Sequence, residues 1–361
     1  MEHFAPASID RLIVPDFKII NESKKTIAAL IMAFQTDYLG SGREKSRLIK
    51  EFVSRIESKI NPTLFQMQAK LENENTIKII NSVSNLEDLL SSSTLVEVER
   101  IKIQEQIIVL KKMAADNVST IERDLEKSTY NLKEELGSLA DINLFEDASN
   151  LSAEKHQELS KIVLQIKNLT SKKEGYQKEY TALVSSMDVM RKHNIFDMFM
   201  DMLPSDAQIT ALGNMAGSSS SGGFSPVGAL TMPEVELVRE GVAIYKKMLN
   251  NISAGFSYMN MQEVRLRIEN QMDEVSTEIT TERKRAREIE DQLADLKRMI
   301  DIHEAKTNYS HQFQQLALSF QTVLNELKII DIEIEPDYNI VNSVFSKFLS
   351  YLQDTVRSMR K

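Results

Sequence analysis

The stretch from Lys155 to Lys192 reads KHQELSKIVLQIKNLTSKKEGYQKEYTALVSSMDVMRK. Large side chains recur along it in alternating steps of three and four residues, which is heptad spacing. A heptad stripe that continues over four repeats predicts a coiled-coil helix. The positions of this stripe are Leu159, Ile162, Ile166, Leu169, Lys173, Tyr176, Tyr180, Leu183, Met187 and Met190.

A second heptad stripe follows after an intervening segment. Because one segment connects the two helices, we expect them to pack antiparallel. Each would be at least ~50 Å long, at about 1.5 Å per residue. The positions of the second stripe are Ile268, Met272, Val275, Ile279, Glu282, Ala286, Ile289, Leu293, Leu296 and Ile300.

The composition of the 361-residue chain favours long helices over a compact enzyme core. Glycine (11) and proline (7) are scarce, and there is no tryptophan. We therefore predict an all-α protein, an elongated rod of three parts. Residues 1–154 and 303–361 would form a multi-helix tail bundle, residues 155–192 and 262–302 an antiparallel coiled-coil neck, and residues 193–261 a small apolar head.

Within the predicted tail, we expect helices over residues 22–60 and 62–90, separated at Asn61-Pro62, and a last amphipathic helix over 337–358. Two runs could instead be extended, Arg11–Ile20 and Lys328–Glu335. In the second run isoleucines alternate with acidic residues, which is a strand signal. The two runs are candidates for a minor β-ribbon at the tail.

The predicted head differs from the rest of the chain in charge. The stretch from His193 to Val238 contains no lysine or arginine, although the chain carries 44 of them. Ten of the seventeen methionines fall between Met187 and Met261. Methionine adapts to irregular apolar surroundings, so this composition suits a segment that is stored in one environment and used in another, such as a membrane.

The head closes with a well-marked helix, expected from Pro233 to Met261. Thr231-Met-Pro-Glu234 forms a capping box with proline in the first turn. Two roles are open to the apolar stripe of this helix. It could pack against the coiled coil, or it could swing away and span a bilayer with its polar face on a water-filled pore. The stripe consists of Val235, Val238, Val242, Tyr245, Leu249, Ile252, Phe256 and Met259.

Several functions find no support in the sequence. There is no cysteine, which excludes disulfides and thiolate chemistry. The net charge of −9 argues against nucleic acid as a partner. The segment Asp37–Ser46 departs from the phosphate-loop pattern and is better read as a turn between helices. The five histidines are scattered, so we expect no metal site, no cofactor and no enzyme activity. The beginning of the sequence lacks the pattern of an ordinary signal peptide, and no apolar run reaches 18 residues.

This layout resembles the α-helical pore-forming toxins of the cytolysin A type, most closely the B component of the binary α-xenorhabdolysin family. The likeness is one of plan and length over the whole chain, without a short diagnostic motif. It implies a secreted, soluble monomer that joins a homologous A component on the bilayer of a target cell. The two would assemble into a ring, and an amphipathic helix of the head would swing out to insert. Single-component members have a more continuous hydrophobic tongue, so the polar head of this chain favours the assisted, two-component version.

On this hypothesis, two further sets of residues have roles in insertion. Large apolar side chains of the head would contact lipid, and glycines between the head segments would act as hinges. The lipid-contacting residues would be Ile195, Phe196, Phe199, Leu203, Leu212, Phe224 and Leu230, and the hinges Gly213, Gly217, Gly222, Gly223 and Gly228.

Two other classes of protein remain open. A structural coiled-coil adaptor with a central dimerisation hinge would also place two heptad arms around a middle segment, but it does not explain the loss of basic residues there. A tip protein of a phage or secretion apparatus could share the plan of a rod with an apolar tip.

Overall fold

The computed structural model describes residues 12–36, 38–73, 76–91, 96–199, 202–214, 230–248, 256–329 and 338–360, and it is all-α over these ranges. The helices follow one another along the chain, and no strand occurs in the described residues. They are α1 (Phe17–Met32), α2 (Gly40–Asn73), α3 (Thr76–Ser91), α4 (Glu97–Ala140), α5 (Phe145–Lys192), α6 (Ile195–Met198), α7 (Asp206–Asn214), α8 (Met232–Met248), α9 (Tyr258–Ile329) and α10 (Tyr338–Met359).

The chain divides into two compact units. Residues 1–154 and 291–361 form one, here called the terminal unit, and residues 155–290 form the other, the central unit. Helices α5 and α9 each contribute to both units. The fold class predicted from the heptad stripes, all-α with long helices, is confirmed.

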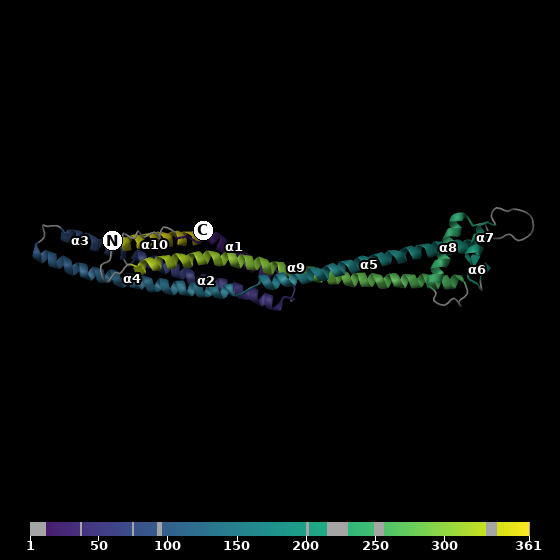
Figure 1. Cartoon of the computed structure of the whole chain (residues 1–361), viewed down its shortest axis with the longest axis horizontal. Coiled ribbons are helices and arrows are strands. Elements are labelled where there is room, and N and C mark those ends of the chain that lie inside the picture. The colour runs from purple at the N-terminus through teal and green to yellow at the C-terminus, as the bar shows by residue number, and fades with distance from the viewer. Residues whose placement is uncertain are drawn as a thin grey trace, which may run out of the picture. The chain divides into compact units, whose positions relative to one another are not determined.

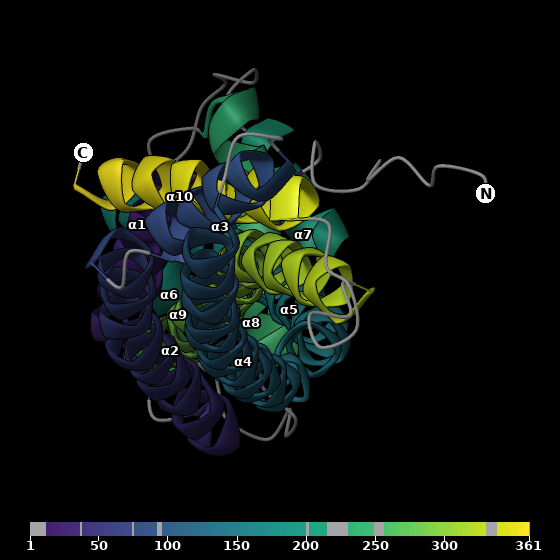
Figure 2. The same ribbon diagram turned by 90° about the vertical axis from the view of Figure 1, so that its left-hand side faces the viewer.

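The terminal unit is a bundle in which α1 to α4, α10 and the C-terminal part of α9 surround one apolar core (Figures 1 and 2). Its largest fully buried side chains come from α9 and α10. The ring centroids of Tyr309 and Phe313 are 4.9 Å apart, and those of Phe320 and Phe348 are 6.2 Å apart. The Tyr309 hydroxyl donates a hydrogen bond to the Val53 carbonyl at 3.0 Å, and burial raises the pKa of this tyrosine.

The first helix corrects the expectation of an extended run at residues 11–20. Asp16 caps α1 by accepting hydrogen bonds from the backbone N–H groups of Lys18 (2.9 Å) and Ile19 (3.3 Å), so Phe17–Ile20 are helical. An N-cap aspartate satisfies donors that a helix leaves free in its first turn. Residues 330–335 of the second candidate strand lie outside the described residues.

The expected helix boundaries at 22–60 and 62–90 were wrong. Pro62 lies inside α2, which runs without a break from Gly40 to Asn73, and α3 begins at Thr76. Proline costs a helix one backbone hydrogen bond. Here Ile60, Leu64 and Met67 are buried on the same face before and after it, so packing holds the helix together. The turn inferred over Asp37–Ser46 is shorter than expected, because only Tyr38 and Leu39 of the described residues are turn residues and Gly40–Ser46 already belong to α2.

A buried carboxylate fixes the connection between α1 and α2 to α9. Asp295 is fully buried and accepts hydrogen bonds from the Thr36 hydroxyl (2.7 Å), the Thr36 N–H (2.8 Å) and the Gln35 N–H (3.1 Å). Burial alone would raise the pKa of Asp295, but these hydrogen bonds outweigh it and lower the pKa below its ordinary value. The backbone N–H groups of Gln35 and Thr36 are therefore satisfied by a buried side chain of α9.

Candidate functional site

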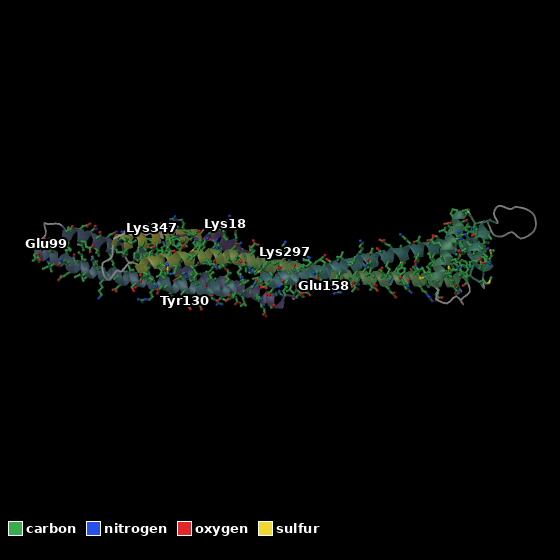
Figure 3. The ribbon with its side chains drawn as sticks, viewed as in Figure 1. Lys18, Glu99, Tyr130, Glu158, Lys297 and Lys347 are labelled. Carbon is green, nitrogen blue, oxygen red and sulfur yellow. The ribbon has the colours of Figure 1, made fainter. Side chains whose placement is uncertain are left out.

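In the central unit, α5 and α9 run side by side (Figure 1). Helices α6, α7 and α8 lie together where α5 ends and α9 begins. Two hydrogen bonds between the helices show that the pairing is antiparallel. Arg285 of α9 donates to Glu158 of α5 at 2.9 Å, and Gln165, which comes later on α5, donates to Glu282, which comes earlier on α9, at 3.3 Å. Glu158 is labelled in Figure 3. Hydrogen bonds from Lys155 and Arg285 lower its pKa. Every position of the α5 stripe from Leu159 to Met190 is buried or half-buried, as the heptad pattern predicts.

A second apolar core, here called the head core, fills the space between these elements. It is built almost entirely from aliphatic, methionine and aromatic side chains of α5, α6, α7, α8 and the start of α9. Its buried members are Leu183, Met187, Met190, Ile195, Phe196, Ile209, Leu212, Leu230, Val235, Val238, Val242, Ile244, Tyr245, Phe256, Met261, Val264 and Ile268.

Helix α8 turns its apolar stripe toward this core and its charged side chains outward. Glu236, Glu240 and Lys246 are exposed, whereas Val238 and Val242 are almost completely buried. Lys247 is also exposed and forms an ion pair with Glu179 on α5. The helix is therefore amphipathic in the sense that its sequence predicts.

Helix α8 and helix α5 approach each other closely at Gly241. A Cβ atom at this position would lie only 2.0 Å from the Ser186 hydroxyl oxygen and 2.4 Å from the Ser186 Cβ. Both residues are buried. Small residues on both helices thus permit a backbone approach that any larger side chain would prevent.

The start of α8 is held by a group of polar contacts centred on Glu234. Its carboxylate accepts hydrogen bonds from the Thr231 N–H (2.8 Å) and hydroxyl (2.9 Å), which confirms the predicted capping box. Lys192 donates to the same carboxylate at 3.1 Å, and the ring nitrogen Nε2 of the buried His193 lies 3.4 Å from it. The hydrogen bonds from Thr231 and Lys192 lower the pKa of Glu234 to about 2.

Aromatic rings join α6 to α8 and to the start of α9. Phe196 stacks on Phe256 with 5.4 Å between ring centroids. Tyr258 packs edge-on against Phe196, and Tyr245 packs edge-on against Phe256, each also with 5.4 Å between centroids. Offset and edge-on pairs of this kind add about 0.5–1.5 kcal/mol each beyond the area they bury. Asn194 begins α6 in the left-handed conformation (φ 51°), which turns the chain from α5 into this cluster.

The residues that we predicted to contact lipid are brought together in the head core. Ile195, Phe196, Leu212 and Leu230 are buried there, and Phe199 and Leu203 pack against it half-buried. Of the predicted hinges, only Gly213 is described; a Cβ atom there would lie 2.7 Å from Val235 Cγ2, so close packing against α8 is one reason for glycine. Phe224, Gly217, Gly222, Gly223 and Gly228 lie outside the described residues.

The predicted extent of the head helix needs correction. Helix α8 ends at Met248, not at Met261, and Leu249 and Ile252 lie outside the described residues. Phe256 precedes α9 and is fully buried, while Met259 lies in the first turn of α9 and is 80% exposed. The apolar stripe that we assigned to one helix therefore extends from α8 to the start of α9, and the periodicity alone does not show where one helix ends and the next begins.

Sequence reasoning missed the pairs that join α8 to its neighbours. These are Gly241 with Ser186, Gly213 with Val235, and Arg239, which donates a hydrogen bond to the Thr210 hydroxyl of α7. A glycine inside a helical pattern is a signal of close packing, but the sequence gives no indication of which residue it faces.

The described part of the chain offers no site for a metal ion formed by three or more His, Asp or Glu side chains. Among the same residues, no helix combines the length and the apolar character required to span a bilayer.

The arrangement of helices is that of the subunits of helical pore-forming toxins. PaxB from Photorhabdus luminescens superimposes with a TM-score of 0.78 at 17% identity, over 96% of this chain and 97% of PaxB. XaxB from Xenorhabdus nematophila gives 0.75 at 18% identity, over 96% and 98%. The XaxAB pore complex from Xenorhabdus nematophila gives 0.67 at 18% identity, over 94% and 96%.

At these identities the likeness concerns the fold. It confirms, at that level, the resemblance to α-xenorhabdolysin components inferred from the layout of the sequence. No protein-family model matches the chain, and no curated protein matches it in sequence.

Proposed function

We propose that this chain is the B-type subunit of a two-component α-pore-forming cytotoxin. In this proposal residues 193–261 are the head that enters the membrane, residues 155–192 and 262–302 the neck, and residues 1–154 and 303–361 the tail. The observation that carries the proposal is the head core, because it stores the large apolar side chains of α6, α7 and α8 against one another. The fold shared with XaxB and PaxB over nearly the full length supports it.

The composition of the head core fits a segment that exchanges one apolar environment for another. Keeping one large aliphatic or aromatic side chain away from water is worth about 1.5–3 kcal/mol. Opening the core into water would lose this free energy for Ile195, Phe196 and Leu212 together. Opening it into a bilayer would retain it, so the open form becomes accessible only at a membrane.

Helix α8 inserts in this proposal with its two faces in different surroundings. Val235, Val238 and Val242 would face lipid or a neighbouring subunit. The charged side chains on the opposite face would have to face water, because a charge in the bilayer interior is costly. A ring of such helices would line a pore with their polar faces. A single copy of α8 has no such arrangement, and we therefore propose that the chain acts with partners.

The proposed partners are a homologous A component and further copies of the same pair in a ring. The support comes from the structures of similar fold, of which one is a complex named for both XaxA and XaxB. The site of action would be the membrane of a target cell, reached after secretion. The glycines Gly213, Gly217, Gly222, Gly223 and Gly228 would allow the segments around them to rearrange, a hinge role that stays part of the proposal.

The test is dye release from liposomes and red cells by the purified chain, with and without a helical protein encoded beside it. We expect leakage with both proteins present, and rings in negative stain on the same membranes. Leakage should fall when Phe199 and Leu203, which are only half-buried, are both changed to aspartate. A chain that gives neither leakage nor rings with any co-encoded partner, and that dimerises in buffer, would instead favour the coiled-coil adaptor.

A further inference from the structure

The large apolar side chains that the head leaves exposed to solvent are all of one kind. In the described part of residues 193–261 they are Met198 (47% exposed), Met202 (65%), Met232 (72%) and Met259 (80%). No large aliphatic or aromatic residue in that part of the head is exposed to this degree. We call these four residues the exposed head methionines.

Three other methionines are enclosed in the head core. Met187 is 3% exposed, and Met190 and Met261 are completely buried. The fold therefore sorts the sulfur atoms around the head into an accessible set and an inaccessible set. Because a reagent dissolved in water reaches only the first set, the exposed head methionines should react before the enclosed ones.

The exposed head methionines lie at or next to the ends of helices. Met198 is the last residue of α6, Met202 follows α6, Met232 is the first residue of α8, and Met259 lies in the first turn of α9. In the proposed function, the segments that carry the first three of these residues leave the head core and exchange water for lipid. A thioether suits this exchange, because it is apolar and adapts to irregular surroundings.

Peroxides convert a thioether into a sulfoxide. Hydrogen peroxide transfers one oxygen atom to the sulfur: the O–O bond breaks, an S=O bond forms, and water leaves. The sulfur loses two electrons, and the peroxide gains them. The product is a polar side chain. The chain has no cysteine thiol that could consume the oxidant first.

The cost of the added oxygen depends on its surroundings. At an exposed position of the folded chain, water hydrates the sulfoxide, so the fold tolerates it. Inside a bilayer the sulfoxide finds neither water nor a hydrogen-bond donor, and a buried polar group without a partner is costly. Oxidation of the exposed head methionines therefore opposes membrane entry while leaving the soluble form intact.

We propose that Met198, Met202, Met232 and Met259 are a modification site, at which a peroxide forms methionine sulfoxide and thereby prevents the head from entering a membrane. The inference rests on the proposed function, because it concerns the surface that would meet lipid. The modification is reversible, since methionine sulfoxide reductases remove the oxygen.

Limited treatment of the full-length chain with hydrogen peroxide, stopped with catalase, tests the reactivity of the sulfur atoms. Peptide mass spectrometry should find the added oxygen at the four exposed head methionines and none at the three enclosed ones. Circular dichroism and thermal unfolding of the treated chain should match those of the untreated chain. Equal oxidation of the two sets, or a treated chain that has lost its fold, would overturn the proposal.

Dye release from liposomes, with untreated partner protein added, tests the consequence. The treated chain should release dye more slowly than the untreated chain by about tenfold or more, because the sulfoxides lack donors in lipid. Sulfoxide reductases for both epimers should restore the rate. Release at the untreated rate by a chain that carries the four sulfoxides would refute this inference alone. An untreated chain that releases no dye would refute the proposed function, and this inference with it.

Leucine substitutions identify the residues, because leucine is close to methionine in volume but has no sulfur. A variant that combines Met198→Leu, Met202→Leu, Met232→Leu and Met259→Leu should release dye within about threefold of the parent rate, and should keep this rate after peroxide treatment. Met32→Leu is the matched control and should stay as sensitive as the parent, since Met32 is 78% exposed but ends α1 in the terminal unit. A quadruple variant that peroxide inactivates as fully as the parent would overturn the assignment.

Discussion

A single polar side chain satisfies the carbonyl groups at the end of α4. Lys306 is buried and donates hydrogen bonds to the carbonyls of Leu139 (3.2 Å), Ala140 (3.4 Å) and Ile142 (2.7 Å) at the end of α4. Burial lowers the pKa of this lysine. No local sequence pattern indicates that a lysine more than 160 residues later satisfies the carbonyls there. Such partners depend on tertiary contact, which local patterns do not encode.

Replacing Lys306 with alanine should destabilise the terminal unit by about 1–3 kcal/mol, because it leaves the last carbonyls of α4 without a donor. Urea denaturation followed by circular dichroism would measure the change. Lys297→Ala is the control on the same helix; Lys297 is exposed (Figure 3), and its removal should change stability by less than about 0.5 kcal/mol. Equal effects of the two substitutions would refute the role given to Lys306.

Glu234 offers a pH-dependent test at the start of α8. Its pKa falls from an ordinary 4.5 to about 2 in the folded chain, so its charge stabilises the folded state above pH 4.5, and this contribution is lost as the pH falls toward 2. Glu234→Gln keeps the hydrogen-bond acceptor but removes the charge, and should cost about 0.3–1 kcal/mol at neutral pH.

Thermal unfolding of the parent and of Glu234→Gln across this range would check the expectation. The difference between them should be constant at pH 5 to 7 and shrink steadily below pH 4.5. Glu240→Gln, farther along the same helix and exposed, serves as the control. A difference that does not change with pH would contradict the assigned role of the carboxylate.

Whole elements were predictable where one periodicity governs them. The stripes of α5 and α9 are heptads, and the structure has both as unbroken helices with those positions buried or half-buried. Prediction failed where packing outweighs a local signal, as at Pro62 inside α2. It failed again where one apolar stripe spans two elements, as between α8 and Phe256. The face that α8 buries could be read from the sequence, but its closest neighbour on α5 could not.

The contact between α8 and α5 predicts the result of enlarging Gly241. A valine there should force the helices apart and destabilise the central unit by about 1–3 kcal/mol, because its Cβ would overlap Ser186. Ala243→Val on the exposed face of α8 is the matched control and should have little effect. Hydrogen exchange of the α8 amides would measure both. Unchanged protection in Gly241→Val would mean that the helices are not packed this closely in solution.

At the scale of the molecule, the two units differ in what their cores contain. The terminal core is tied together by buried polar clamps such as Asp295 and Lys306. The head core is almost wholly apolar, and the polar contacts of α8 lie at its margin, through Glu234, Arg239 and Lys247. An apolar core with contacts only at its edge can separate without leaving buried polar groups unsatisfied. The composition of residues 193–261 therefore indicated the character of this region, while the structure shows which side chains it brings together.

The central claim is that the head core opens when the chain acts on a membrane. A cysteine pair at Gly213 and Val235 tests it most directly, since the Cβ atoms would be 3.9 Å apart, within the range for a disulfide, and would tie α7 to α8. With the disulfide formed, the chain and its partner protein should release no more dye from liposomes than the partner alone, and reduction should restore leakage to the level of the two single-cysteine variants. Leakage at the same rate with the disulfide intact would contradict the claim.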